Sequence, residues 1–170
     1  MGLDEANMDV TDFLKDHRGY TPESLARHIR ERVLVETRLT CSAGIGCNKM
    51  LAKICSDFNK PDGQTYLEPE AEKIREFMRK LNIRKVPGLG RMQELVLNEL
   101  GIFSCADILE NAADLSIAFN ERYFQQAVKE ALGVSRNRHE PIDYDEVQKN
   151  ISCSRTIQPI RQYEEFVHTL

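Results

Sequence analysis

The 170-residue chain has no tryptophan, few aromatic residues and no apolar run long enough to cross a membrane. Its first residues carry no signal-peptide pattern. Its four histidines are scattered, which argues against a zinc site, and its cysteines are odd in number without a C-x-x-C pair. The sequence therefore predicts buried, reduced thiols in an intracellular protein. The cysteines are Cys41, Cys47, Cys55, Cys105 and Cys153.

Charge is distributed unevenly along the chain, although the formal net charge is only −4 at pH 7. The first 16 residues hold five acids against one base, whereas residues 73–101 hold seven bases against three acids. An acidic segment and a basic segment in one chain suit a protein that holds metal ions in one place and phosphates in another.

Residues 1–67 have the pattern of a sheet covered by helices. Apolar and polar residues alternate from Leu3 to Phe13, which predicts a strand, and residues 39–45 and 65–67 predict two more. Two helices are predicted between them, one starting at Thr21-Pro22-Glu23 and one capped by Asn48. Their apolar faces are expected to contain Leu25, Ile29 and Val33, and Leu51, Ile54, Cys55 and Phe58, respectively. In the first helix, Arg27, Arg30 and Arg32 are interpreted as a solvated face.

From residue 68 to about residue 138 the pattern is helical, so the predicted fold class is α+β, with a boundary at Glu68-Pro69-Glu70. One of these helices is expected to bury Leu89, Met92, Val96 and Leu100 on one face. A polar linker follows, and Ile151–Ile157 predicts the first strand of a further unit.

The strongest local motif is Val86-Pro87-Gly88-Leu89-Gly90, the pattern of a helix-hairpin-helix hairpin. Pro87 and Gly88 favour a tight turn, and Gly90 lets a phosphate approach the backbone at a helix N-terminus. Such a hairpin binds duplex backbone without reading sequence. The alternative is an ordinary turn between helices.

Two further groups of charged residues are candidates for chemistry. Asp4 and Glu5 are adjacent carboxylates that would suit Mg²⁺, or else are solvated acids at a strand end. Lys60 lies on a Pro-Asp-Gly turn, where it could present a point charge to a triphosphate. Lys49 and Lys53 are spaced to share a helix face and are most simply solvated.

Four motifs occur in a fixed order and together resemble the Y-family, or translesion, DNA polymerases. They are Leu-Asp-Glu-Ala from residue 3, Ser-Ala-Gly-Ile-Gly-Cys-Asn-Lys-Met-Leu-Ala-Lys-Ile-Cys-Ser-Asp from residue 42, Asn-Lys-Pro-Asp-Gly-Gln from residue 59, and Val-Pro-Gly-Leu-Gly from residue 86. The resemblance covers nearly the whole chain. It implies a partial palm with a ferredoxin-like sheet at 1–67, a helical thumb with a helix-hairpin-helix at 68–138, a linker at 139–149, and the start of a little finger at 150–170.

The resemblance also implies roles for individual residues. Asp4 and Glu5 match palm carboxylates that bind two catalytic Mg²⁺ ions, for which Mn²⁺ can substitute. Lys60 matches the lysine that contacts the triphosphate of the incoming deoxynucleotide. The DNA-binding residues of the thumb would be Lys85, Val86, Gly88, Gly90 and Arg91. The implied partners are primer–template DNA, a deoxynucleoside triphosphate and a sliding clamp bound through other regions, with no membrane, and the implied location is the nucleus.

The chain also departs from the family pattern. Gly2 and Asn7 stand where the family has serine and an aromatic residue, so local palm packing is expected to differ. The resemblance places the family's first metal-binding aspartate and its fingers before Met1, and we therefore expect the isolated chain to be inactive. Two alternatives remain. One is a non-catalytic module that binds DNA backbone through the hairpin, and the other is a small α/β fold that acts only through protein partners.

Overall fold

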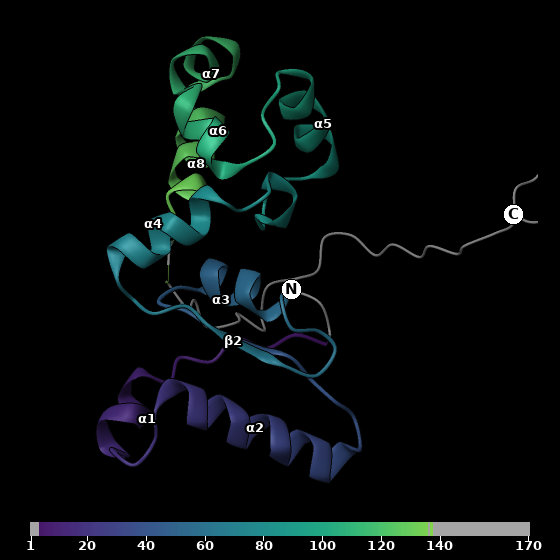
Figure 1. Ribbon diagram of the computed structural model, residues 1–170, viewed down its shortest axis with the longest axis vertical. Helices are drawn as coiled ribbons and strands as arrows, with labels where there is room; N and C mark the ends of the chain where they lie inside the picture. Colours follow the sequence, from purple (N-terminus) through teal and green to yellow (C-terminus); the bar gives the residue numbers. More distant parts are fainter. Residues whose placement is uncertain (1–3, 136, 138–170) are drawn as a thin grey trace, which may run out of the picture. The chain divides into compact units, whose positions relative to one another are not determined.

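The computed structural model describes residues 4–135 and 137. These residues contain a small parallel sheet and a larger number of helices, as Figure 1 shows. The elements are α1 (Thr11–Asp16), α2 (Pro22–Thr37), β1 (Ala43–Ile45), α3 (Lys49–Ser56), β2 (Gln64–Tyr66), α4 (Ala71–Arg79), the 3₁₀ helix η1 (Ile83–Lys85), α5 (Arg91–Glu99), α6 (Cys105–Glu110), α7 (Ala112–Ala118) and α8 (Glu121–Ala131). The expected α+β class is confirmed, while the expected strand at 151–157 lies outside the described residues.

The sheet consists of β1 and β2, which run parallel with Gly44 opposite Thr65. Helix α2 lies on one side of this sheet and α3 on the other (Figure 1). Helix α3 comes very close to β1, because a Cβ added at Gly44 would lie 1.9 Å from the Ala52 carbonyl oxygen. Glycine at this position is therefore what allows the helix to rest directly on the strand.

Local sequence signals explain how α2 and α3 begin. The Thr21 hydroxyl accepts the Ser24 N–H at 3.1 Å, and Pro22 occupies the first helical position. The Asn48 side chain accepts the Leu51 N–H at 2.8 Å at the start of α3. Both predicted helix starts are confirmed.

Three predictions about the first 67 residues are wrong. The segment expected as the first strand is a loop followed by α1, because the Asp9 carboxylate accepts the Thr11 N–H at 3.0 Å and the chain turns into a helix. The strand expected over 39–45 is confined to Ala43–Ile45. Phe58 lies beyond the end of α3 and is half exposed, whereas Leu51, Ile54 and Cys55 are buried.

A fourth prediction about this part of the chain is also wrong, because Arg30 belongs to the interior of the layer and not to a solvated face. Its guanidinium donates to the Cys41 carbonyl at 3.0 Å, to the Gln64 side chain at 3.3 Å and to the Asp62 carboxylate. Only 17% of its side chain is exposed. Arg30 therefore connects α2 to the ends of both strands.

The hydrophobic core is one continuous cluster that joins α3 to the helices from α4 to α8. Its fully buried members include Leu51 and Ile54 from α3, and Met78, Leu97 and Ile108 from the helical part. The apolar face expected for the helix after the hairpin is wrong except for Leu89, which packs against the core. Met92, Val96 and Leu100 are exposed and Leu97 is buried in their place. No helix among residues 4–135 and 137 combines the length and apolarity needed to span a bilayer.

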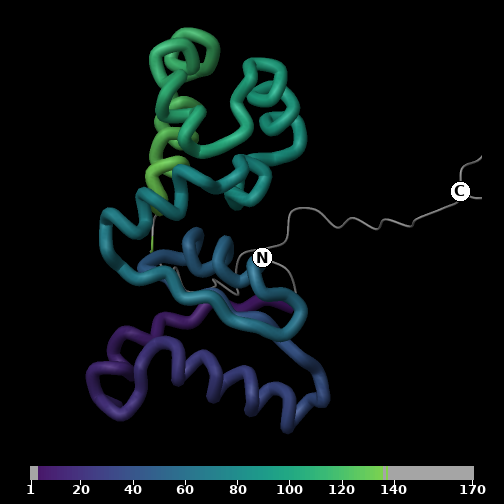
Figure 2. The backbone as a smooth tube through the Cα atoms, viewed as in Figure 1, coloured from purple at the N-terminus to yellow at the C-terminus, as the bar shows by residue number. Residues whose placement is uncertain are grey.

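The chain after α8 returns to the beginning of α3, as the tube in Figure 2 shows. The Asn48 amide donates to the Gly133 carbonyl at 2.8 Å, and the Asn137 amide donates to the Cys47 carbonyl at 2.8 Å. In addition, the Lys49 N–H donates to the Asn137 side chain at 3.2 Å. The N-terminus of α3 is thus held by residues more than 80 positions later in the chain.

Candidate functional site

Asp4 and Glu5, the predicted metal ligands, lie in the exposed segment that leads to α1. The Glu5 carboxylate accepts a hydrogen bond from the Lys53 ammonium group of α3. Carboxylate oxygens are the donors that Mg²⁺ prefers, so the chemistry of the pair suits this ion. No group of three or more histidine, cysteine or acidic side chains that could hold a metal occurs among the residues the structure describes. The two acids would therefore need a further ligand.

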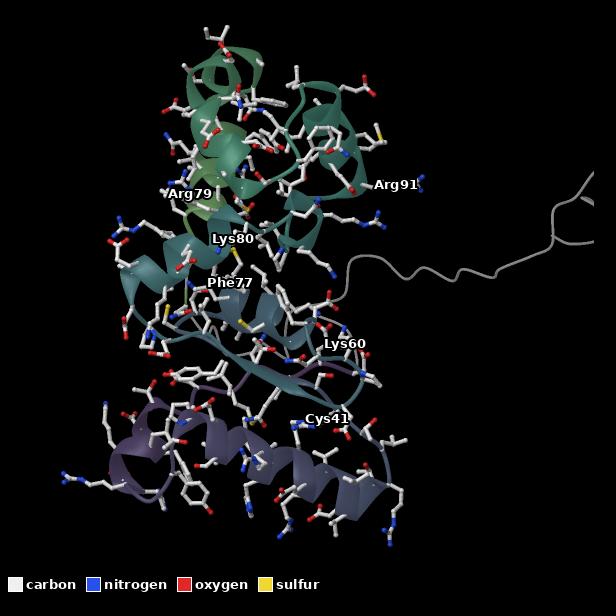
Figure 3. The ribbon with its side chains drawn as sticks, in the orientation of Figure 1. Cys41, Lys60, Phe77, Arg79, Lys80 and Arg91 are labelled. Atoms are coloured by element: carbon white, nitrogen blue, oxygen red, sulfur yellow. The ribbon has the colours of Figure 1, made fainter. Side chains whose placement is uncertain are left out.

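Lys60, the predicted triphosphate contact, lies in the turn between α3 and β2 (Figure 3). Its ammonium nitrogen is 3.1 Å from Oδ1 of Asp57, the residue at the C-terminal end of α3. The other carboxylate oxygen of Asp57 accepts a hydrogen bond from Lys85, at the end of η1. Hydrogen bonds from Lys85 and then Lys60 hold the pKa of the Asp57 carboxyl below its ordinary value. Asp57 thus joins two predicted site residues that lie 25 positions apart.

The predicted hairpin follows η1 and ends at Gly90, the N-cap of α5. Val86 is only 2% exposed, so its side chain packs into the core. Gly88 has a φ of +105°, which L-residues with a side chain rarely adopt. The Gly90 N–H donates to the Gln93 side chain at 2.8 Å, and Arg91 points away from the body of the protein (Figure 3).

Glu130 on α8 lies directly beneath this hairpin and is 8% exposed. A Cβ added at Gly88 would lie 3.0 Å from its Oε1, which also accepts a hydrogen bond from the Gln126 amide at 2.7 Å. Burial raises the pKa of the Glu130 carboxyl, and burial followed by the charge of Glu130 raises the pKa of Tyr123. The Tyr123 hydroxyl is buried and has no hydrogen-bond partner among the described residues. All these residues border one pocket of about 300 Å³.

A larger pocket of about 400 Å³ lies beside the ring pair Phe58 and Phe77, whose centroids are 5.4 Å apart. The lysines on its rim, Lys73 and Lys80, are both paired with acids on or next to α4. The pocket therefore has an apolar floor and a neutralised rim, and it contains none of the predicted site residues.

Helix α3 and its C-cap residue hold three of the predicted site residues through charge pairs. Lys53 on α3 pairs with Glu5. Asp57, the C-cap of α3 four positions later, pairs with both Lys60 and Lys85. Asp57 and Glu130 were not among the predicted site residues. Asp57 could have been found from its spacing of three residues from Lys60, and Glu130 from its place beside Ala127 and Ala131 on an apolar helix face.

The sequence of this chain is similar to those of several known proteins. Residues 1–57 match the impB/mucB/samB family. Human DNA polymerase kappa is 37% identical over 147 residues, which is 86% of this chain and 17% of that protein. DNA polymerase IV of Shewanella oneidensis is 44% identical over 108 residues, which is 64% of this chain and 29% of that protein.

The fold of the chain is also similar to solved structures of DNA polymerases. The structure described as the insertion ternary complex of Dbh DNA polymerase aligns with a TM-score of 0.62 and 31% identity, covering 79% of this chain and 38% of that one. The chain therefore spans less than a third of the length of the two curated relatives and less than half of the solved polymerase.

Proposed function

Because the chain is homologous over part of its length to Y-family DNA polymerases, we propose that it is the part of such an enzyme that holds the nucleotide and the primer–template duplex. The whole protein would be a DNA-directed DNA polymerase that adds deoxynucleotides to a primer 3′-hydroxyl opposite damaged template. The observation that carries this proposal is the combined likeness in sequence and fold to named polymerases.

In this proposal, residues 1–67 form the later part of a palm and residues 68–138 a thumb. The linker expected at 139–149 and the little finger expected at 150–170 lie outside the described residues. Residues of α3 and of the later helices belong to one hydrophobic core.

Asp4 and Glu5 would hold Mg²⁺ together with a further ligand, and Mn²⁺ could replace it. Two such ions would activate the primer hydroxyl and neutralise the leaving pyrophosphate. Lys53 keeps the Glu5 carboxylate next to α3, which supports a defined position for this ligand. Lys60 would contact the triphosphate, and its place on a short turn after α3 limits where its ammonium group can go.

Lys85, Val86, Gly88, Gly90 and Arg91 would bind the duplex backbone. Val86 contributes by packing the hairpin onto the core, since its side chain is buried. The exposed Arg91 begins α5, where the positive end of the helix favours phosphate. A sliding clamp would bind through other regions of the whole protein, which would act in the nucleus.

The hairpin offers a sharp test of DNA binding. A Cβ at Gly90 has room, because its nearest neighbour would be 3.8 Å away, so Gly90→Val should fold yet block the approach of a phosphate. We expect salt-sensitive binding of a fluorescent duplex that weakens about tenfold in this variant, because an approaching phosphate loses its backbone contacts. Gly19→Val is the matched control, since nothing lies within 4 Å of a Cβ added at Gly19. Equal binding by both variants would contradict the proposed thumb.

Primer extension tests the catalytic part and separates it from the alternative of a DNA-binding module. We expect no extension by the 170-residue chain in Mg²⁺ or Mn²⁺, because two acids alone bind the ions weakly. Extension that is lost in an Asp4→Ala/Glu5→Ala variant would show that the chain carries a complete site. Restoring activity by placing this chain within a full-length polymerase, and losing it again with the same double variant, would support the proposed role of the two acids over a purely binding role.

A further inference from the structure

Asp57 and the two lysines it holds form an exposed charged cluster at the C-terminal end of α3. One oxygen of Asp57 faces Lys60 and the other faces Lys85, so two ammonium groups from separate segments converge on one small anion. More than half of each lysine side chain is exposed, and 36% of the Asp57 side chain is exposed. The cluster is therefore accessible from solvent.

The position of Asp57 is electrostatically unfavourable for an acid. Asp57 is the C-cap of α3, and the C-terminal end of a helix carries a partial negative charge that favours cations. An anion at this point depends on the two lysines for compensation. The cluster has one acid and two bases, so it keeps a net positive charge.

We propose that Lys60 and Lys85 together form a binding subsite for a phosphate group, and that Asp57 occupies this subsite when the phosphate is absent. Like the carboxylate, a phosphate offers several acceptor oxygens on a compact anion, and lysines bind phosphate as mobile point charges. The phosphate would displace the carboxylate of Asp57 and take both ammonium groups. This inference rests on the proposed function, in which Lys60 contacts a triphosphate.

Two sources of phosphate have the same chemistry, namely the phosphoanhydride of a nucleotide and the phosphodiester of a DNA backbone. Lys60 lies on the turn assigned to the nucleotide, whereas Lys85 comes immediately before the hairpin assigned to DNA. The subsite thus lies where the two ligands would meet. A probe for each source can distinguish them.

Asp57→Asn tests the displacement directly, because it keeps the shape of the side chain and removes its charge. Removing one unit charge about 4 Å from a bound phosphate in water should strengthen binding about fivefold. We would measure the affinity of the whole chain for inorganic tripolyphosphate by calorimetry. The nitrogen resonances of the lysine ammonium groups would be recorded in the same titration, with a short DNA duplex as the second probe.

The expected result is tighter tripolyphosphate binding in Asp57→Asn, with both Lys60 and Lys85 resonances shifting on addition. Lys60→Gln and Lys85→Gln should each weaken binding. Glu76→Gln is the matched control, because Glu76 also pairs with an exposed lysine, Lys80, but lies outside the cluster. A response of the lysine pair to the duplex and not to tripolyphosphate would assign the subsite to the DNA backbone.

Unchanged or weaker binding of both probes in Asp57→Asn would overturn the proposal, and so would a Lys85 resonance that responds to neither. These outcomes differ from failure of the proposed function. Loss of the Gly90-dependent duplex binding would refute the thumb assignment even if tripolyphosphate bound to both lysines. Conversely, Gly90-dependent duplex binding without any response of the lysine pair would refute the subsite and the proposed DNA contact of Lys85, and would leave the hairpin as the element that binds the duplex.

Discussion

The close approach of α3 to β1 predicts that Gly44→Ala is severely destabilising. The added methyl carbon would lie 1.9 Å from the Ala52 carbonyl oxygen, 2.3 Å from the Ser56 nitrogen and 2.9 Å from the Cys55 carbonyl carbon. All three are backbone atoms of the helix or its last turn, so no side chain can rotate to make room. The helix would have to move away from the strand by about 1.5 Å before ordinary contact distances return.

The cost of this movement can be estimated from two terms. Overpacking of a well-packed interior typically costs 1–3 kcal/mol, and the upper end applies because the clash is with backbone. Moving α3 also loosens the contacts of Leu51 and Ile54, which are 0% and 2% exposed. We therefore expect a loss of about 3–4 kcal/mol in the free energy of unfolding. That is a large part of the 5–15 kcal/mol typical of small domains.

Urea unfolding followed by circular dichroism measures this loss. With a typical dependence of about 2 kcal/mol per molar urea, the midpoint should fall by about 1.5–2 M. Gly19→Ala is the control, since nothing lies within 4 Å of an added Cβ there, and its midpoint should stay close to that of the wild type. If Gly44→Ala unfolded within 0.5 kcal/mol of the control, the packing of α3 on β1 described above would be wrong.

Further predictions concern Arg30 and Glu130. Arg30→Met should lower the free energy of unfolding in urea by about 2 kcal/mol, because the Cys41 carbonyl and the Gln64 and Asp62 side chains lose their donor. Arg30→Lys should recover little of this stability, since an ammonium group cannot reproduce the guanidinium fork. If Arg30→Met left the free energy of unfolding unchanged, the interior role of Arg30 would be refuted. Burial raises the pKa of Glu130 in the folded state above its value in the unfolded chain, so its contribution to stability is present at low pH and is lost as the pH rises through the folded pKa. Unfolding free energies measured from pH 4 to pH 8 should therefore fall more steeply for the wild type than for Glu130→Gln, and parallel profiles would contradict this account.

The sequence predicted those features that depend on neighbouring residues. The caps at Thr21 and Asn48 and the turn after α3 are specified by local hydrogen bonding and were correctly placed. The expected first strand failed because alternation gives a strand only where a partner strand is available, and Asp9 instead supports the start of α1. Helix α5 has four apolar residues within six positions, Met92, Leu95, Val96 and Leu97, so periodicity could not reveal that Leu97 is the buried one.

In the candidate site, too, the sequence indicated the residues of local motifs but not the contacts between residues far apart in the chain. The resemblance assigned Asp4, Glu5 and Lys60 to ordered motifs, and their metal and nucleotide roles stay predictions. The bridge from Asp57 to Lys85 joins residues 28 positions apart, and no periodicity encodes such a contact. Arg30 was misread for a similar reason, since its partners Asp62 and Gln64 lie more than 30 positions away.

The return of the chain to the start of α3 has a mechanical consequence. Three hydrogen bonds connect residues 47–49 with Gly133 and Asn137, and they close the segment between them into a loop. Tension applied between Asn137 and residues that precede α3 would pass through these bonds and bypass β2 and all the helices from α4 to α8. The helices from α4 to α8 would carry no force until these three hydrogen bonds broke, and only then would they begin to stretch.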